Sequence, residues 1–340
     1  MRILLVKLSS MGDIFHTYPA ISDLKSVYPG ARLEWLVDRQ FAEIAAWHPG
    51  VDEIHPLPLR ALKKNRNLVL KKSISDLLGR VRMRHYDFII DAQGLIKSAW
   101  LTRQMKGLRC GYNHRSIREK LATLFYQKRF SVSKEQHAIT RIRQLFAKTL
   151  NYEDSLESLP EQGLKQSDWQ KPAAAPEHYG LIFPGTTWLT KHWPLKHWRT
   201  FLQTSKHQIP LFIGWGTESE QKNAMEMSDQ GQLATVFDFR LDFEEMASWI
   251  AHSDWVIGVD TGFVHLANAM QIPVIAIFGP TSPQHTGVTG DKSRNIAMRL
   301  PCFPCRRKTC KIAMNKDQVV CMEKLTPDQL ISCSSELFIK

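Results

Sequence analysis

Residues 255–269, with the sequence WVIGVDTGFVHLANA, have the pattern of an anion-binding site. Val256–Val259 is typical of a buried parallel strand. Asp260-Thr261-Gly262 then predicts a sharp turn, and Phe263–Ala269 has the pattern of a short helix. The first amides of such a helix point toward the strand end and carry the positive end of the helix dipole. This arrangement suits a phosphate or diphosphate. We therefore expect a nucleotide-linked substrate here, with Thr261 as a hydroxyl donor and His265 near the same pocket.

Two further polar loops follow expected strands in the same half of the chain. The loop at 184–194, PGTTWLTKHWP, offers the hydroxyls of Thr186 and Thr187 to phosphate oxygens. Lys191 would offset charge that develops on a leaving diphosphate, although it could also be an ordinary surface lysine. Beyond Gly214-Trp215-Gly216, the carboxylate of Glu220 could accept hydrogen bonds from ribose hydroxyls. It could equally be a first-turn acid favoured by the helix dipole.

The first half of the chain carries a loop suited to acid–base chemistry. The segment KLSSMGDIFHT follows the first expected strand and places Ser9, Ser10, Gly12 and Asp13 at its carboxyl end. Asp13 is positioned to take a proton from an acceptor hydroxyl as a general base. The alternative is a helix N-cap, a position that aspartate favours.

A second loop of the first half, DAQGLIKS, also ends a strand. Its Asp91, Gln93, Lys97 and Ser98 are polar groups where an acceptor could lie.

Short apolar runs separated by helical segments predict an α/β fold. The expected strands are Ile3–Val6, Leu33–Val37, Phe88–Asp91, Leu181–Phe183, Leu211–Ile213, Thr235–Phe237, Val256–Val259 and Val274–Phe278. A polar stretch from about Asn151 to Glu177 is interpreted as the interdomain connection. At 340 residues the chain suggests two domains. Two doubly wound domains in series would face a cleft lined by the carboxyl ends of both sheets.

Composition excludes several classes of protein. The chain is 43% hydrophobic and 23% charged, and no apolar run approaches the roughly 20 residues that cross a bilayer. The N-terminus lacks a secretory signal, so the six cysteines are expected in reducing cytosol. The absence of a full GxGxxG, a Walker lysine loop and an Asp-x-Asp pair counts against dehydrogenases, P-loop NTPases and metal-assisted diphosphate binding.

The net charge of +12 predicts an anionic partner. Much of it lies between residues 60 and 84, where the basic residues oppose only Asp76; they are Arg60, Lys63, Lys64, Arg66, Lys71, Lys72, Arg80, Arg82 and Arg84. Nucleic acid, a phosphorylated glycolipid or an acidic membrane surface could each explain them. A solvated helical face is the alternative.

Cysteines form a separate pattern near the C-terminus. Cys302, Cys305, Cys310 and Cys321 fall within 20 residues, and four thiols can build a structural zinc or iron site. The spacing matches no standard finger, and the neighbouring Arg306, Arg307 and Lys308 would favour thiolates without a metal. Free thiols are therefore the alternative.

Five segments together resemble glycosyltransferase family 9, the lipopolysaccharide heptosyltransferases. They are KLSSMGDIFHTYPA, IDAQGLIKSA, TTWLTKHWP, the Trp215-to-Glu220 spacing and VDTGFVHLANA, and the first two are most similar to the branch that uses a Kdo-lipid A acceptor. The resemblance implies a GT-B fold of two Rossmann-like domains. Residues 1–165 would bind the acceptor, residues 166–315 the ADP-sugar, and the tail 316–340 would pack on the first domain.

The resemblance also implies an activity. It is the inverting, metal-independent transfer of L-glycero-D-manno-heptose from ADP-heptose to the Kdo of a Kdo-lipid A precursor, at the cytoplasmic face of the inner membrane. Asp13 matches the catalytic base and Lys191 the diphosphate-stabilising lysine. Thr186, Thr187, Asp260, Thr261, Gly262 and His265 match donor contacts, and Glu220 matches the ribose contact. The acceptor would meet Ser9, Ser10, Gly12, Arg60, Lys63, Lys64, Asp91, Gln93 and Lys97, and the anionic inner leaflet would be a partner in place of nucleic acid.

Three alternatives stay open at this point. One is a family-9 transferase that acts on the first core heptose or on a protein hydroxyl, which the cysteine-rich tail favours. Another is a nucleotide-sugar 2-epimerase, which would turn over the donor with no acceptor. The third is a basic module that only binds polyanions, whose binding would fall steeply with salt.

Overall fold

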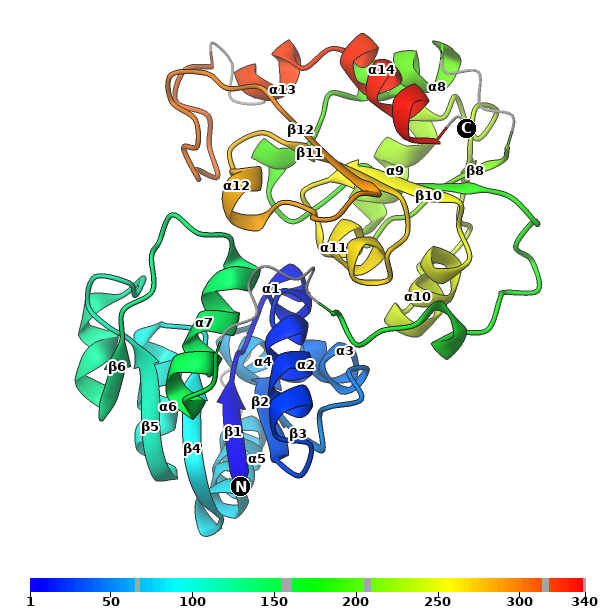
Figure 1. Cartoon of the computed structure of the whole chain (residues 1–340). Helices are drawn as coiled ribbons and strands as arrows, with labels where there is room; N and C mark the ends of the chain where they lie inside the picture. The colour runs from blue at the N-terminus through cyan, green and yellow to red at the C-terminus, as the bar shows by residue number, and fades with distance from the viewer. Residues whose placement is uncertain (65–67, 154–160, 205–208, 314–317, 339–340) are drawn as a thin grey trace. The chain divides into compact units, whose positions relative to one another are not determined.

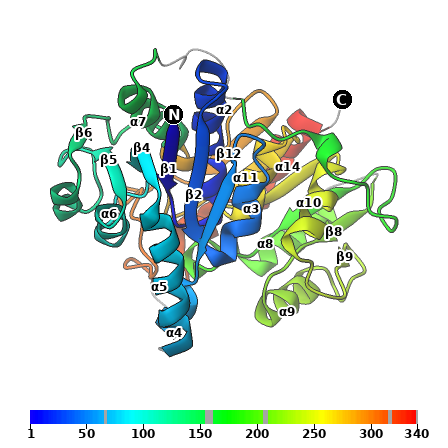
Figure 2. The ribbon, with the colours of Figure 1, turned by 90° about the horizontal axis from the view of Figure 1, so that it is seen from below.

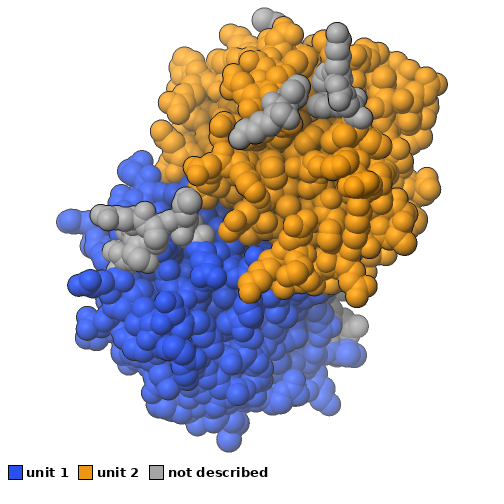
Figure 3. Space-filling view, turned by 45° about the vertical axis from the view of Figure 1, so that its right-hand side comes forward, with its two compact units in different colours: residues 1–164 blue, residues 165–340 orange. Residues whose placement is uncertain are grey.

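The computed structural model describes residues 1–64, 68–153, 161–204, 209–313 and 318–338 (Figure 1). The chain divides into two compact units, Met1–Leu164 and Lys165–Lys340 (Figure 3). The division lies one residue before the boundary expected from the sequence. Among the described residues, no helix has the length and apolar character needed to span a bilayer.

The first unit alternates strands and helices. Its strands are β1 (Arg2–Val6), β2 (Arg32–Asp38), β3 (Glu53–Leu57), β4 (His85–Asp91), β5 (Lys106–Tyr112) and β6 (Lys128–Phe130). Its helices are α1 (Met11–Phe15), α2 (Tyr18–Val27), α3 (Ala42–Ala46), α4 (Leu59–Lys64), α5 (Leu68–Met83), α6 (Ile96–Arg103) and α7 (Ala138–Leu150), with 3₁₀ turns η1 (Arg39–Phe41) and η2 (Lys120–Phe125).

The six strands form one parallel sheet in the order β3-β2-β1-β4-β5-β6. Apolar side chains cover both faces, as a parallel sheet between helix layers requires. On one face Leu4 and Val6 of β1 pack with Leu78 and Val81 of α5. On the other, Trp35 of β2 meets Tyr18 of α2, and α2 packs against α7. Figure 2 shows α5 as a long helix that follows α4.

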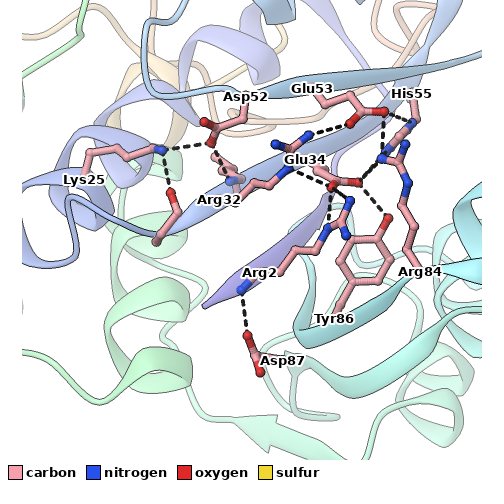
Figure 4. Close-up of polar contacts among 12 residues, drawn as sticks. Arg2, Lys25, Arg32, Glu34, Asp52, Glu53, His55, Arg84, Tyr86 and Asp87 are labelled. Atoms are coloured by element: carbon pink, nitrogen blue, oxygen red, sulfur yellow. Dashed lines mark hydrogen bonds and ion pairs between the residues drawn. The ribbon is translucent and has the colours of Figure 1, made fainter.

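A buried carboxylate ties the amino-terminal ends of four strands together (Figure 4). Glu34 of β2 has no exposed side-chain surface and accepts from Arg2 Nε at 2.6 Å and from Arg84 Nη1 at 2.7 Å. Its Oε2 also accepts from the Tyr86 hydroxyl at 2.8 Å and lies 2.8 Å from His55 Nε2. Burial raises the pKa of Glu34, but these hydrogen bonds outweigh it and lower the pKa from 4.5 to about 2.

Glu34→Gln is expected to lower the free energy of unfolding by about 3 kcal/mol at neutral pH, because the part-exposed guanidinium groups around it lose a buried counter-charge. A lowered folded-state pKa contributes stability above the unfolded-state value and loses it as pH falls. The deficit of the variant should therefore shrink between about pH 4.5 and pH 2, the range between the two pKa values. Urea unfolding at several pH values measures this. Glu53→Gln is the matched control, since Glu53 pairs with Arg84 at 2.7 Å but is 30% exposed; an equal loss in both variants would contradict the assignment.

The second unit repeats the same plan. Its strands are β7 (Gly180–Phe183), β8 (Leu211–Ile213), β9 (Thr235–Val236), β10 (Trp255–Val259), β11 (Val274–Phe278) and β12 (Ser293–Ala297). Its helices are α8 (Leu195–Thr204), α9 (Glu218–Met227), α10 (Phe243–Ala251), α11 (Gly262–Ala269), α12 (Pro283–Thr286), α13 (Val320–Lys324) and α14 (Pro327–Phe338), with 3₁₀ turns η3 (Gln166–Asp168) and η4 (Leu189–Lys191).

The second sheet is also parallel, in the order β12-β11-β10-β7-β8-β9. Because β7 begins this unit, the order is that of the first sheet, with the chain reversing direction across the sheet between β7 and β10. In an open parallel sheet, ligands bind outside the carboxyl ends of the strands at such a point. The predicted donor loops follow β7, β8 and β10.

The C-terminal tail belongs to the core of the second unit, which corrects the expectation that it packs on the first domain. Met322, Leu325 and Leu330 are buried with the side chains of α8, and Trp193 Nε1 donates to the Leu325 carbonyl at 2.8 Å. The apolar side chains of α14 recur on one side of the helix, so that side must be buried. The helix contacts α8 and β12 of the second unit, near which it lies in Figure 1.

The structure contains all eight strands expected from the sequence, with small shifts at their ends. Four more were not predicted, namely β3, β5, β6 and β12. Their sequences EIHPL, KGLRCGY, KRF and SRNIA mix apolar residues with charges, proline or glycine. Three of the four lie at sheet edges, where partial exposure removes the continuous apolar run that marks a buried strand.

Candidate active site

The loops after β7 and β8 meet through a glycine and a carboxylate. A side chain at Gly185 would place its Cβ 2.8 Å from Glu220 Oε1, so Glu220 would have to move to admit one. The Gly216 amide donates to Glu220 Oε2 at 2.8 Å, and the Thr217 hydroxyl accepts from the Glu220 amide at 3.2 Å. Glu220 therefore lies beside the 184–187 loop, at the start of α9, with a fixed orientation.

Asp260 organises the loops after β7, β10 and β11. Its buried Oδ2 lies 2.7 Å from Lys191 Nζ and accepts from the Thr281 hydroxyl at 2.6 Å. His265 Nε2 lies 3.3 Å from Oδ1. Burial raises the pKa of Asp260, but the His265 hydrogen bond and the Lys191 charge outweigh it and hold the pKa well below its usual value. An ionised Asp260 thus holds the ammonium group of Lys191 in place.

The helix after this turn begins where the sequence predicted it. Thr261 is the N-cap of α11, yet its side chain makes no capping bond to the first turn. The amides at this N-terminus keep the donor character and positive dipole that attract a phosphate. Phe263 stacks on Phe183 at 4.9 Å between ring centroids, which fixes α11 against the sheet.

A histidine holds the backbone of Thr186 in the loop after β7. His192 Nε2 lies 3.1 Å from the amide nitrogen and 2.6 Å from the carbonyl oxygen of Thr186. Thr187 is exposed, and its hydroxyl is open to solvent. This part of the loop is therefore held by its backbone, which leaves the Thr187 side chain accessible.

In the first unit, Asp13 lies at the carboxyl end of β1. Its Oδ2 accepts from the Ser10 amide at 2.8 Å and from the Ser10 hydroxyl at 3.0 Å, and its Oδ1 lies 3.4 Å from Lys7 Nζ. Ser10, not Asp13, is the N-cap of α1, so Asp13 supports the cap from the third helical position. Burial raises the pKa of Asp13, but the Lys7 charge and the Ser10 bonds outweigh it and lower the pKa.

Gln93 and Asp91 support this loop from β4. Gln93 Oε1 accepts from the amides of Leu8 at 2.8 Å and Ser9 at 3.1 Å. Asp91 is fully buried and accepts from the Gln93 amide at 2.9 Å and from the Tyr126 hydroxyl at 2.7 Å. Burial raises the pKa of Asp91 despite these bonds. Asp91 thus positions Gln93 and the loop, and it offers no free carboxylate to an acceptor.

Comparison with known proteins places the chain in a family. A sequence model of glycosyltransferase family 9 (heptosyltransferase) matches residues 74–315. Lipopolysaccharide heptosyltransferase 1 of Pseudomonas aeruginosa is 38% identical, with 97% of this chain and 96% of that protein aligned. The chain belongs to glycosyltransferase family 9.

Two solved structures of a heptosyltransferase have the same fold as this family-9 enzyme. The structure of E. coli heptosyltransferase WaaC with ADP superimposes with a TM-score of 0.85 at 31% identity over 99% of both chains. WaaC with ADP-2-deoxy-2-fluoro heptose gives a TM-score of 0.82 at 30% identity, also over 99% of both chains. The protein is thus a glycosyltransferase of the predicted GT-B class, with two parallel α/β sheets.

Two of the residues predicted to meet the acceptor, Arg60 and Lys97, are exposed to solvent. Arg60 is exposed, donates to Gln40 Oε1 at 3.0 Å and lies 4.8 Å from the Phe41 ring centroid. Lys97 is exposed on α6. The side chains of Lys63 and Lys64 lie outside the described part of the structure.

Part of the expected basic surface is neutralised. Arg84 pairs with both Glu34 and Glu53, each at 2.7 Å, so acids from outside the 60–84 segment add to Asp76, the one acid within it. The two acids come from β2 and β3, and sequence separation hid them. Arg84 is therefore not available to an anionic partner.

The structure also bears on the metal question. In the described ranges, Glu34, Glu53 and His55 are the only group of at least three such side chains with ligand atoms within 4.8 Å of one another. Their oxygens already accept from Arg2, Arg32 and Arg84, so this group is an ion-pair network. Cys302, Cys305, Cys310 and Cys321 line one small cavity, and a metal there stays a prediction.

Sequence reasoning missed three groups that shape the site. Lys7 faces Asp13, Thr281 bonds Asp260, and Trp188 lies under Lys191 with 5.4 Å between Nζ and the ring centroid. Lys7 and Thr281 directly follow strand ends, so the rule that identified Asp13 and Asp260 also applies to them. Trp188 has no such signal, since tryptophans in this segment are mostly core residues.

Proposed function

We propose that this glycosyltransferase moves L-glycero-D-manno-heptose from ADP-heptose to the Kdo of a Kdo-lipid A precursor during synthesis of the lipopolysaccharide inner core. One observation carries the proposal. The Lys191–Asp260–His265 cluster stands at a helix N-terminus, in a chain 38% identical to a lipopolysaccharide heptosyltransferase 1. The WaaC structure with an ADP-heptose analogue supports the same donor.

The first unit would supply the base. Asp13 is 38% exposed at its side chain, and its lowered pKa keeps it ionised at neutral pH. It takes the proton from an acceptor hydroxyl of Kdo, and the freed electron pair of that oxygen forms the new bond to the anomeric carbon. Ser9, Ser10 and Gly12 would shape the acceptor side of this loop.

The second unit would stabilise the leaving group. The bond between the anomeric carbon and the diphosphate oxygen breaks, and its electrons pass to ADP. Lys191, Thr261 and the first amides of α11 offset the charge that develops there. Glu220 would hold the ribose hydroxyls. A single displacement inverts the configuration at the anomeric carbon.

We propose that the reaction needs no metal ion, because a lysine, hydroxyls and helix amides together cover the developing negative charge. Thr186, Thr187 and Gly262 complete the donor loops. Their positions after β7 and β10 support this role.

The chain would act at the cytoplasmic face of the inner membrane. Leu68 and Val69 at the start of α5 are 77% and 71% exposed, and the exposed Lys71 and Lys72 follow within one turn. Apolar side chains beside cations suit an anionic bilayer surface. This supports peripheral association with such a surface.

The direct test is heptose transfer from ADP-heptose to a Kdo-lipid A acceptor, with an acceptor-free control and with EDTA present. Product that needs the acceptor and survives EDTA is the expected result. Turnover of ADP-heptose without acceptor would instead identify a 2-epimerase. ADP-heptose binding with no glycolipid product would move the acceptor to the first core heptose or a protein hydroxyl.

A further inference from the structure

A cavity of about 230 Å³ lies in the first unit, between the edge strand β3 and helix α5, which packs against that strand. One wall is a single face of α5, because its lining residues are spaced three or four positions apart. They are Ser73, Leu77, Arg80 and Arg84, and Glu53 of β3 and Arg39 of η1 line the cavity from the other side.

We propose that this cavity binds a phosphate monoester with a short carbon stem, through the guanidinium groups of Arg39 and Arg80. The site does not depend on the proposed function, because none of its lining residues is among those assigned to the donor or the acceptor.

The acids beside the cavity are already paired (Figure 4). Glu53 accepts from Arg84 on Oε1 at 2.7 Å and from Arg32 on Oε2 at 2.9 Å. The buried Glu34 accepts from Arg84 and from Arg2. Three arginines thus face two carboxylates, and Arg84 is held within this network. The wall that it forms keeps an excess of positive charge.

Arg39 and Arg80 bring two further cations to the same cavity. Both are exposed, and neither pairs with an acid in the part of the chain that the structure describes. They come from different elements, so it is the fold that places these like charges around one space. A cavity lined by charge of one sign attracts counter-ions, and a bound anion would relieve the repulsion between the two guanidinium groups.

The lining favours a phosphate monoester over other anions. Guanidinium groups bind phosphate oxygens through paired N–H donors. The two free cations match the nearly two negative charges that a monoester carries at neutral pH, whereas a diester or a carboxylate carries one. The half-buried Ser73 can donate its hydroxyl to the same group, and Leu77 offers an apolar surface to a carbon stem. The volume is below the roughly 300–1,000 Å³ of sites for larger ligands, so the ligand is small.

The first test is titration calorimetry of the full-length chain with sn-glycerol 3-phosphate, with and without saturating ADP. We expect one site per chain in both cases, with a Kd on the order of 1 mM. Arg39→Gln and Arg80→Gln should each weaken binding about tenfold, because each removes a charge-assisted hydrogen bond.

Arg103→Gln is the matched control. Arg103 is exposed in the last turn of α6, in the same unit, and its loss should leave the affinity for glycerol phosphate unchanged. Wild-type protein that does not bind, binding that ADP abolishes, or an equal loss in all three variants would each overturn the proposal.

The second test separates a lipid headgroup from a soluble ester. Phosphatidylcholine vesicles with phosphatidic acid present a monoester, whereas vesicles with phosphatidylglycerol, matched in zeta potential, present a diester. For a headgroup, Arg80→Gln should lower binding to the phosphatidic acid vesicles about tenfold and leave binding to the phosphatidylglycerol vesicles unchanged. For a soluble ester, Arg80→Gln should bind both kinds of vesicle like the wild type, and only its affinity for glycerol phosphate should fall. Equal losses on both kinds of vesicle, with unchanged affinity for glycerol phosphate, would make Arg80 a general surface charge and overturn the site.

Discussion

Asp13→Asn is expected to abolish heptose transfer, with a loss of kcat of at least about a thousandfold. The amide keeps the size of the carboxylate and can still accept from the Ser10 amide, which donates to Asp13 at 2.8 Å in the wild type. It cannot take a proton from an acceptor hydroxyl. ADP affinity should stay near that of the wild type, because the residues proposed to bind the donor come from the second unit. Calorimetric ADP binding and single-turnover transfer measure the two effects separately.

The pH dependence follows from the surroundings of the same residue. The Lys7 charge and the Ser10 bonds lower the pKa of Asp13 below 3.8 despite its burial. A lowered pKa keeps the Asp13 carboxylate ionised as pH falls. The decrease of kcat that protonation of Asp13 causes should therefore lie below about pH 4. Lys7→Met removes the cation and should shift this decrease to higher pH.

Asp328→Asn is the control for the aspartate prediction, since Asp328 is exposed on α14 and should leave kcat unchanged. A parallel loss of ADP affinity in Asp13→Asn would count against a base on the acceptor side. A kcat close to that of the wild type would remove Asp13 from the chemistry altogether.

Lys191→Met is expected to lower kcat about a hundredfold, the typical effect of losing one group that stabilises a developing anion. Lys191 Nζ contacts the Asp260 carboxylate at 2.7 Å and the Asp260 carbonyl at 3.2 Å. An ammonium group has three donors, so one stays available to a diphosphate oxygen. Methionine keeps most of the side-chain volume and its contact with Trp188, which isolates the loss of charge.

The same change leaves a buried carboxylate without its cation. The pKa of Asp260 should rise, because the Lys191 charge is one of the causes that lower it. The melting temperature should fall, so kcat is compared at a temperature where the variant is folded. Lys196→Met is the matched control, since Lys196 pairs with Glu323 at 2.8 Å on the surface. If Lys191→Met turned over at the wild-type rate, the lysine would have no part in the departure of ADP.

The sequence located the polar loops because each of them comes after an apolar strand that its composition reveals. Asp260 directly follows β10, whereas Asp13, Lys191 and Glu220 lie in the loop or the first helical turn after β1, β7 and β8. Parallel strands of one sheet place such loops at the same edge. The sequence therefore predicted the α/β class and placed Lys191, Glu220 and Asp260 in segments that follow strands of one sheet.

Other features depend on contacts between residues far apart in the chain. Arg84 looked free until the fold brought Glu34 and Glu53 to it, 50 and 31 positions away in the chain. Asp91 looked like a substrate contact, but β5 and Tyr126 enclose it. A residue's own neighbours in sequence do not reveal burial or a partner on another strand.

The C-terminal residues show the same division. The sequence shows four cysteines within 20 residues. Only the tertiary structure places all four around one cavity, which Thr190 also lines. The tail was expected on the first domain, but its apolar side chains pack into the core of the second unit beside α8. Local sequence determined which groups could react, because reactivity belongs to residue type. The fold decided which of them are paired, buried or adjacent, because long-range packing sets those distances.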